Sequence, residues 1–153
     1  MDATTVTFLF TDIEGSTRLW QEHPTTMPEV LARHDVLVRD VIEGRGGDLF
    51  KHTGDGACAA FTDATAALDA AVAVQRTLAD ADWGDGPHPR VRVALDSGPA
   101  QRRDADYFGP TLNRAARVLA VGSAGQILAT AATVHLAPGA DVIDLGLHRL
   151  RDL

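Results

Sequence analysis

Residues 4–12 read TTVTFLFTD, a run of β-branched, aromatic and aliphatic residues that ends at Thr11-Asp12. Such a run, stopped by polar residues, predicts a buried β-strand. A short helical piece is predicted next, at about residues 14–20. Apolar residues then recur at helical spacing, which predicts a longer helix over about 27–43, ending at the glycine-rich stretch 44–47.

The rest of the chain alternates between strand and helix patterns. Apolar stretches at 48–52 and 57–61 flank Asp55-Gly56, and an Asp-Gly pair between extended runs predicts a β-hairpin. A helix over about 64–80 and an alternating strand over 90–95 follow. Pro110 suits the start of a third helix, to about Val121. Strands are also predicted at 126–129, 141–144 and 147–150.

This order of elements predicts an α+β fold. We expect a ferredoxin-like βαββαβ core sheet with helices packed on it, followed by extra C-terminal α/β elements. The 153 residues are 45% hydrophobic and 23% charged, which is typical of one globular domain. No repeat or linker divides the chain, so residues 1–153 are expected to form a single domain.

The composition excludes several functional classes. The net charge is −7 and the 14 basic residues are scattered, so we expect no nucleic-acid partner. No apolar run approaches the ~20 residues of a membrane helix, and the start of the chain lacks a secretory signal, so no membrane contact is expected. A single cysteine, Cys58, fits a cytoplasmic location.

Two aspartates occur where predicted strands stop. Asp12 follows the first strand, and Asp55 lies in the hairpin turn. If that strand neighbours the hairpin, both carboxylates point into one site, which would suit Mg²⁺ or Mn²⁺ and phosphoryl transfer. Each residue also has an ordinary explanation, because Asp-Gly suits any tight hairpin and Asp12 could cap the next helix. Taken singly, each aspartate favours the structural explanation.

Other polar residues are also open to two interpretations. Asn113 and Arg117 lie four apart on one face of the third helix, with Asp106 in the loop before it. As an isolated pair, Asn113 and Arg117 favour an ordinary exposed polar face. Lys51, at the end of an apolar strand, either extends to solvent or binds a ligand.

Several familiar patterns are missing or incomplete. The sequence has neither a GxxxxGK[ST] phosphate loop nor a GxGxxG motif. Residues 46–50 (GGDLF) resemble the GGDEF signature of diguanylate cyclases but carry leucine where that family needs glutamate, so we reject it. The six histidines show no metal-ligand spacing. His34 is expected to be a hydrogen-bonded core residue, and Trp20 and Trp83 are expected to pack.

Three longer motifs, in order along the chain, point to one family. Residues 8–17 (FLFTDIEGST), 51–56 (KHTGDG) and 106–117 (DYFGPTLNRAAR) closely resemble the signature motifs of class III adenylyl/guanylyl cyclase catalytic domains. Residues 125–128 (GQIL) resemble the strand that follows. The resemblance covers nearly the whole chain, and three motifs in register are far more specific than any single residue.

The resemblance implies two-metal-ion catalysis of nucleotide cyclisation. Asp12 and Asp55 would bind two Mg²⁺ or Mn²⁺ ions, with the carbonyl of Ile13 as a further ligand. Asn113 would position the ribose, and Arg117 would stabilise charge on the α-phosphate in the transition state. The products would be a 3′,5′-cyclic nucleotide and pyrophosphate.

Lys51 and Asp106 occupy the family's base-selecting positions. The Watson–Crick edge of adenine offers an acceptor at N1 and a donor at N6, which fit a lysine donor and an aspartate acceptor. Guanine offers the reverse, and mismatched buried polar groups discriminate strongly. The expected substrate is therefore ATP, and the expected product is cyclic AMP.

The resemblance also implies phosphate contacts and a dimer. Arg151 matches a basic residue that contacts the terminal phosphates. The backbone N–H groups at a helix start would also face phosphate; they belong to Gly15, Ser16 and Thr17. In this family one subunit supplies the metal aspartates and the other supplies the remaining site residues. Because this chain carries both sets, the expected partner is a second copy in a homodimer.

Two departures from the family pattern stand out. Asp96-Ser97-Gly98 lies where many members have a histidine before Ser/Thr-Gly, and the chain stops at 151–153 where the family continues into another strand. The C-terminal strand is therefore expected to be cut short. Three alternatives stay open: a cyclase-like domain that binds nucleotide without turnover, a guanylate cyclase, and a purely structural ferredoxin-like module.

Overall fold

The computed structural model describes residues 4–146. It contains one sheet, and the strands at the centre of the sheet are antiparallel. Strand β1 (Thr4–Ile13) is central, antiparallel to β3 (Gly56–Phe61) on one side and to β4 (Val91–Arg103) on the other. The outer strands are β2 (Asp48–His52) beside β3, β5 (Asp106–Phe108) beside β4, and β6 (Ile127–Ala129), which runs parallel to β4. The order β2-β3-β1-β4 confirms the α+β ferredoxin-like prediction.

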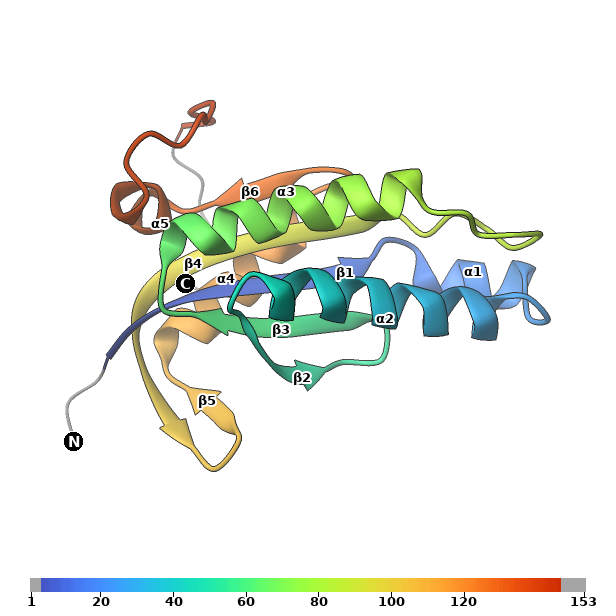
Figure 1. The fold of residues 1–153 in the computed structure, drawn as a ribbon, viewed down its shortest axis with the longest axis horizontal. Helices are drawn as coiled ribbons and strands as arrows, with labels where there is room; N and C mark the ends of the chain where they lie inside the picture. Colours follow the sequence, from blue (N-terminus) through green and yellow to red (C-terminus); the bar gives the residue numbers. More distant parts are fainter. Residues whose placement is uncertain (1–3, 147–153) are drawn as a thin grey trace.

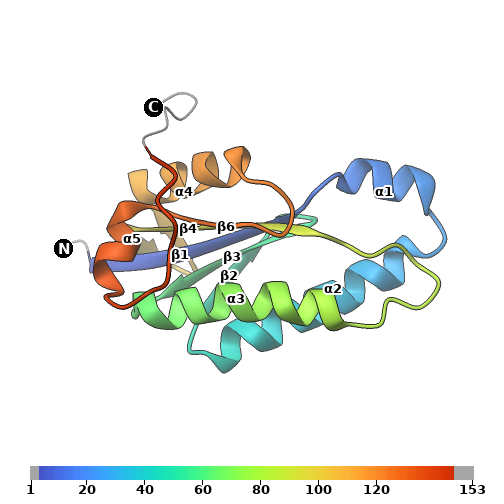
Figure 2. The same ribbon diagram turned by 90° about the horizontal axis from the view of Figure 1, so that it is seen from above.

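Helices cover both faces of the sheet (Figure 1). Figure 2 shows α2 (Met27–Gly44) and α3 (Ala64–Asp80) on one face and α4 (Pro110–Val121) on the opposite face. Two short helices, α1 (Ser16–Glu22) and α5 (Ala131–Leu136), lie near opposite ends of the sheet. Among residues 4–146, no helix is long and apolar enough to cross a membrane.

The run of β-branched, aromatic and aliphatic residues in β1 follows from this three-layer arrangement. Leu9 and Ile13 belong to the core beneath α2 and α3, whereas Phe8 and Phe10 belong to a second core on the side of α4. Because successive strand residues point to opposite faces, a strand buried on both sides needs apolar residues at nearly every position.

The structure corrects several predictions about local elements. Residues 141–144 are not a strand, and the strand predicted at 147–150 lies outside the described residues. The sequence patterns missed α5, a six-residue helix that is too short to show an apolar period. Its N-cap is Thr130, whose side chain accepts from Thr133 N. Trp20 is exposed, whereas Trp83 packs against the core as expected and His34 is buried beside Asp35 as expected.

Strand β4 is longer than the pattern predicted, because it continues past Leu95 to Arg103. Its far end pairs with β5 and forms an arm that projects from the sheet (Figure 1). Pro99 lies between the stretches of β4 that β6 and β5 cover, so one edge of the strand has no strand partner there. A proline is tolerated at such an edge, although it hid the strand from the sequence pattern.

Two buried threonines of β1 allow a direct test of this packing. Thr11 Oγ1 is buried without a hydrogen-bond partner among residues 4–146, whereas Thr7 Oγ1 lies 2.7 Å from Ser97 Oγ. Thr11→Val removes an unsatisfied hydroxyl and is expected to raise the free energy of unfolding by about 1 kcal/mol; Thr7→Val is expected to lower it by about 1 kcal/mol. Urea unfolding of both variants measures the difference, and effects of the same sign would contradict this account.

Candidate active site

The two predicted metal aspartates lie at the same end of the sheet. Asp12 pairs in register with Gly56, and Ile13 N donates to the Asp55 carbonyl oxygen at 3.2 Å. A Cβ at Gly56 would come within 2.3 Å of the Thr11 carbonyl oxygen, so only glycine lets the hairpin turn approach β1 this closely. Asp12 lies inside β1 rather than after it, and it does not cap α1, whose N-cap is Gly15.

An arginine that the sequence analysis did not single out binds Asp12. Arg92 lies opposite Asp12 on β4, and its Nε donates to Asp12 Oδ1 at 2.8 Å while its Nη2 donates to Oδ2. These hydrogen bonds raise the pKa of Arg92, and the charges of Asp12, Glu14 and Asp55 raise it further. Asp12 thus binds the guanidinium directly, and the charges of Glu14 and Asp55 act on it without direct contact.

This group of acidic residues is suited to cations. The Asp12 carboxylate already holds a positive group, and the available donors are carboxylate and main-chain oxygens, which hard divalent ions prefer. Within the described part of the chain, however, no three His, Cys, Asp or Glu side chains converge on one point. A divalent ion bound by Asp12 and Asp55 would therefore need further oxygens, such as the Ile13 carbonyl and the phosphates of a nucleotide.

The two predicted base-selecting residues form an ion pair. Lys51 Nζ lies 2.9 Å from Asp106 Oδ2, and Asp106 Oδ1 accepts from Tyr107 N at 2.8 Å. The hydrogen bond with Lys51 lowers the pKa of the Asp106 carboxyl, and the same contact raises the pKa of Lys51. Both side chains are therefore charged throughout the neutral pH range. Asp106 begins β5 and does not lie in a loop as predicted.

An apolar cluster lies next to this ion pair. The rings of Phe8, Phe50 and Tyr107 pack edge-on or tilted, with centroids 4.9–6.0 Å apart. Cys58 lies opposite Lys51 in the β2–β3 register, and burial raises the pKa of its thiol to about 11. Phe8 is fully buried, whereas Phe50 and Tyr107 are partly exposed. A nucleobase needs hydrogen bonds at its edge and an apolar contact for its ring, and here the polar pair and these two rings are available for them.

Helix α4 carries the two predicted catalytic side chains, Asn113 and Arg117. Asn113 is exposed and Arg117 is partly buried. Strand alternation places Asp12 on the same face of the sheet as Phe8 and Phe10, which is the face that α4 covers. Among residues 4–146, no hydrogen bond or ion pair joins the Lys51–Asp106 pair to Asp12 or Asp55. The chain thus brings four of the predicted residues together in two separate pairs, Lys51 with Asp106 and Asp12 with Asp55.

The predicted phosphate contacts fall on α1 and on the end of the chain. Gly15 is in the left-handed conformation (φ 66°) at the N-cap of α1, and no side chain caps the helix there. The role of Gly15, Ser16 and Thr17 stays a prediction. Arg151 lies outside the described residues.

Comparisons with known proteins agree with the fold. Residues 2–144 match the family described as adenylate and guanylate cyclase catalytic domain. A solved structure of a Trypanosoma brucei adenylate cyclase in its monomeric state superimposes with a TM-score of 0.91 at 30% sequence identity, covering 97% of this chain and 83% of that one. The chain belongs to the adenylate and guanylate cyclase catalytic domain family.

Two relatives found by sequence align with most of this chain. It is 40% identical over 157 residues to an uncharacterized protein of Mycobacterium tuberculosis, an alignment that covers 97% of this chain and 52% of that protein. It is 32% identical over 157 residues to the adenylate cyclase of Schizosaccharomyces pombe, covering 86% of this chain and 9% of that protein. The chain thus spans about half the length of the mycobacterial relative.

Proposed function

We propose that this chain is an adenylate cyclase that converts ATP to 3′,5′-cyclic AMP and pyrophosphate. The observation that carries the proposal is the Lys51–Asp106 ion pair, 2.9 Å long, beside an apolar cluster. A protonated lysine donates to N1 of adenine, and an ionised aspartate accepts from its N6 amino group. Guanine would set its N1–H against the ammonium and its O6 against the carboxylate, which leaves both groups mismatched.

The reacting end of the nucleotide is assigned to the other pair. Asp12 and Asp55, with the Ile13 carbonyl, would hold two Mg²⁺ or Mn²⁺ ions. When bound, such ions lower the pKa of the ribose 3′-hydroxyl and neutralise the triphosphate. Arg92 binds Asp12 in the structure. Once metal ions take its place on Asp12, its guanidinium would turn toward the phosphates. The backbone N–H groups at the start of α1 would also face the phosphates.

Helix α4 supplies the groups for the chemical step. Asn113 orients the ribose so that its 3′-oxygen faces the α-phosphorus. The 3′-hydroxyl gives up its proton to solvent, the new bond joins the 3′-oxygen to that phosphorus, the bond from the phosphorus to the oxygen that bridges to the β-phosphate breaks, and pyrophosphate leaves with that oxygen. Arg117 stabilises the negative charge that grows on the α-phosphate oxygens during this exchange. Arg151 is assigned to the terminal phosphates.

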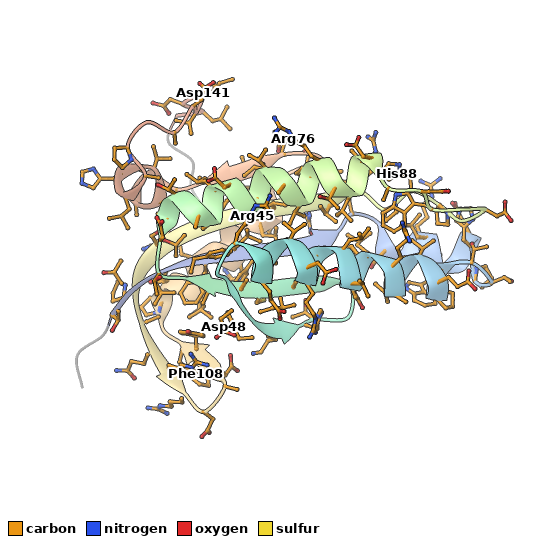
Figure 3. All side chains as sticks on the ribbon, viewed as in Figure 1. Arg45, Asp48, Arg76, His88, Phe108 and Asp141 are labelled. Carbon is orange, nitrogen blue, oxygen red and sulfur yellow. The ribbon has the colours of Figure 1, made fainter. Side chains whose placement is uncertain are left out.

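We assign the complete site to a homodimer. In the family that the chain resembles, one subunit supplies the metal aspartates and the other supplies the remaining site residues, so one nucleotide would draw on both copies of this chain. Phe108 is 48% exposed on the β4–β5 arm (Figure 3) and offers apolar surface to a second copy. A cytoplasmic location stays a prediction from the single cysteine.

A second candidate function is nucleotide binding without turnover. One observation favours it: both oxygens of Asp12 already bind Arg92, so a divalent ion must displace a guanidinium before it can bind. A chain in which Arg92 keeps Asp12 would bind ATP through Lys51 and Asp106 and release it unchanged. Guanylate cyclase activity is the other alternative, and the Lys51–Asp106 pair speaks against it.

Reversing the base-selecting pair tests the assignment of ATP. Lys51→Glu with Asp106→Ala removes the donor for N1 and the acceptor for N6, and it supplies an acceptor for the guanine edge. We expect the ratio of kcat/KM for ATP to that for GTP to fall by about 10²-fold or more. Steady-state assays of both nucleotides measure this ratio. Arg76→Glu, a charge reversal on the exposed face of α3 (Figure 3), is the matched control. An unchanged preference for ATP in the double variant would refute the assignment.

A further inference from the structure

A buried carboxylate on β4 is hydrogen-bonded to three separate segments. The side chain of Asp96 is fully buried. Its Oδ1 accepts from Ser97 N at 2.9 Å and from Thr130 Oγ1 at 2.7 Å, and its Oδ2 accepts from Arg114 Nε at 2.6 Å. Arg114 belongs to α4, and Thr130 is the N-cap of α5. One side chain thus ties β4, α4 and the start of α5 together.

Helix α4 packs on the sheet mainly through small or partly buried side chains. Its buried residues are Thr111, Ala115 and Val118, and Leu112 and Leu119 pack against the core while partly exposed, so its most deeply buried side chains are small. At its first turn, Thr111 Oγ1 donates to the Pro99 carbonyl oxygen, and a Cβ at Gly98 would come within 2.6 Å of that hydroxyl. The Arg114–Asp96 ion pair, one turn further along, is a charged contact that joins the helix to β4.

The position of Arg114 couples this contact to the chemistry. Arg114 directly follows Asn113 and precedes Arg117 by three residues, so any shift of α4 moves both side chains. An α-helix rises 1.5 Å per residue, and a misplacement of about 1 Å can cost about 10²-fold in rate. Asp96 itself is buried and cannot contact the substrate.

We infer that Asp96, acting through Arg114, is a positioning residue that holds Asn113 and Arg117 in place for cyclisation. This inference rests on the proposed function. It differs from a purely structural role, in which the charges matter only because a buried charge needs a partner. A neutral pair of similar volume would satisfy a structural role, because an uncharged side chain at the buried position 96 needs no ionic partner and the Arg114 side chain is itself 42% exposed.

The test therefore removes both charges together. Asp96→Asn with Arg114→Met keeps acceptors for Ser97 and Thr130 and leaves no unpaired charge. We expect the thermal midpoint to stay within a few degrees of the unmodified chain, kcat to fall by about 10²-fold and KM for ATP to change by less than about threefold. KM is spared because the base and metal residues lie on other elements. Arg114→Lys, which keeps the charge, is expected to retain more activity than the double variant.

The matched control is an exposed ion pair. Arg18 and Glu22 on α1 are 79% and 50% exposed, and their Nε–Oε1 distance is 2.8 Å. Arg18→Met with Glu22→Gln is expected to leave kcat unchanged. If the double variant fails to fold, Asp96→Asn alone is measured instead. This variant keeps an oxygen that accepts from Ser97 and Thr130, and its kcat is also expected to fall.

Hydrogen exchange of the α4 amides separates this inference from the proposed function. Faster exchange over residues 110–121 with unchanged exchange in α2 and α3 is expected in the double variant. If the unmodified chain makes no cyclic nucleotide, the proposed function is wrong. The exchange rates of the α4 amides still show whether Asp96 fixes the position of α4. A double variant with unaltered kcat and unaltered α4 exchange would overturn the inference, as would a loss of kcat that only follows a loss of folded protein.

Discussion

Replacing Asp12 with asparagine is expected to lower the rate of cyclic nucleotide formation by about 10³-fold or more. The amide keeps the size of the side chain but removes the negative charge that would bind a divalent ion, and such an ion supplies several kcal/mol of transition-state stabilisation. Asp55→Asn is expected to have a similar effect. Cyclic nucleotide released per protomer, measured at saturating ATP and Mn²⁺, gives the comparison.

The control for Asp12→Asn is a carboxylate that lies far from the site. Asp69 is exposed on α3, so Asp69→Asn makes the same chemical change without touching the sheet end. Some stability should be lost, because the side chains of Arg92 and Asp12 are only 25% and 22% exposed and a hydrogen bond to a charged group contributes about 1.5–3 kcal/mol, so rates are compared per folded protomer. An Asp12→Asn variant with the activity of Asp69→Asn would show that this aspartate is not a metal ligand.

Arg117→Ala is expected to lower kcat by about 10²- to 10³-fold with little effect on KM for ATP, since the guanidinium is assigned to charge that appears only in the transition state. Steady-state kinetics separate the two constants. The control is Arg76→Ala on the exposed face of α3 (Figure 3). A raised KM with unaltered kcat would instead assign Arg117 to ground-state binding.

Mixing two inactive chains extends this prediction to the dimer. In a mixture of Asp12→Asn and Arg117→Ala chains, each mixed dimer has one site with both defects and one site with neither. About a quarter of the activity of the unmodified chain should therefore return after mixing. If all site residues acted within one chain, mixing would restore nothing.

The core of the fold was predictable because local signals agreed with each other. The apolar run 4–10, the Asp55-Gly56 turn and the helical periods over 27–43 and 64–80 each specify one element, and together they specify the ferredoxin-like order. The elements that were missed are short or depend on tertiary contacts. Strand β5 has three residues, and it exists because β4 continues past Pro99 to pair with it.

The candidate site was predictable only in part. A sequence motif identifies site residues, but it does not identify the residues that contact them in the folded chain. The resemblance pointed to Lys51 and Asp106 as a pair, and the structure places them 2.9 Å apart. Arg92 carried no local signal, because its importance comes from the β1–β4 register that sets it opposite Asp12. Asp96 was visible as a departure from the family pattern, but its partner Arg114 follows only from the packing of α4.

The most direct test of the central claim is an assay of cyclic nucleotide formation. The purified chain is incubated with ATP or GTP and with Mg²⁺ or Mn²⁺, the products are separated by chromatography, and Asp12→Asn serves as the blank. We expect cyclic AMP from ATP, little or no cyclic GMP from GTP, and no product in the blank. Nucleotide that binds but is recovered unchanged under every condition would contradict the account and favour a binding domain.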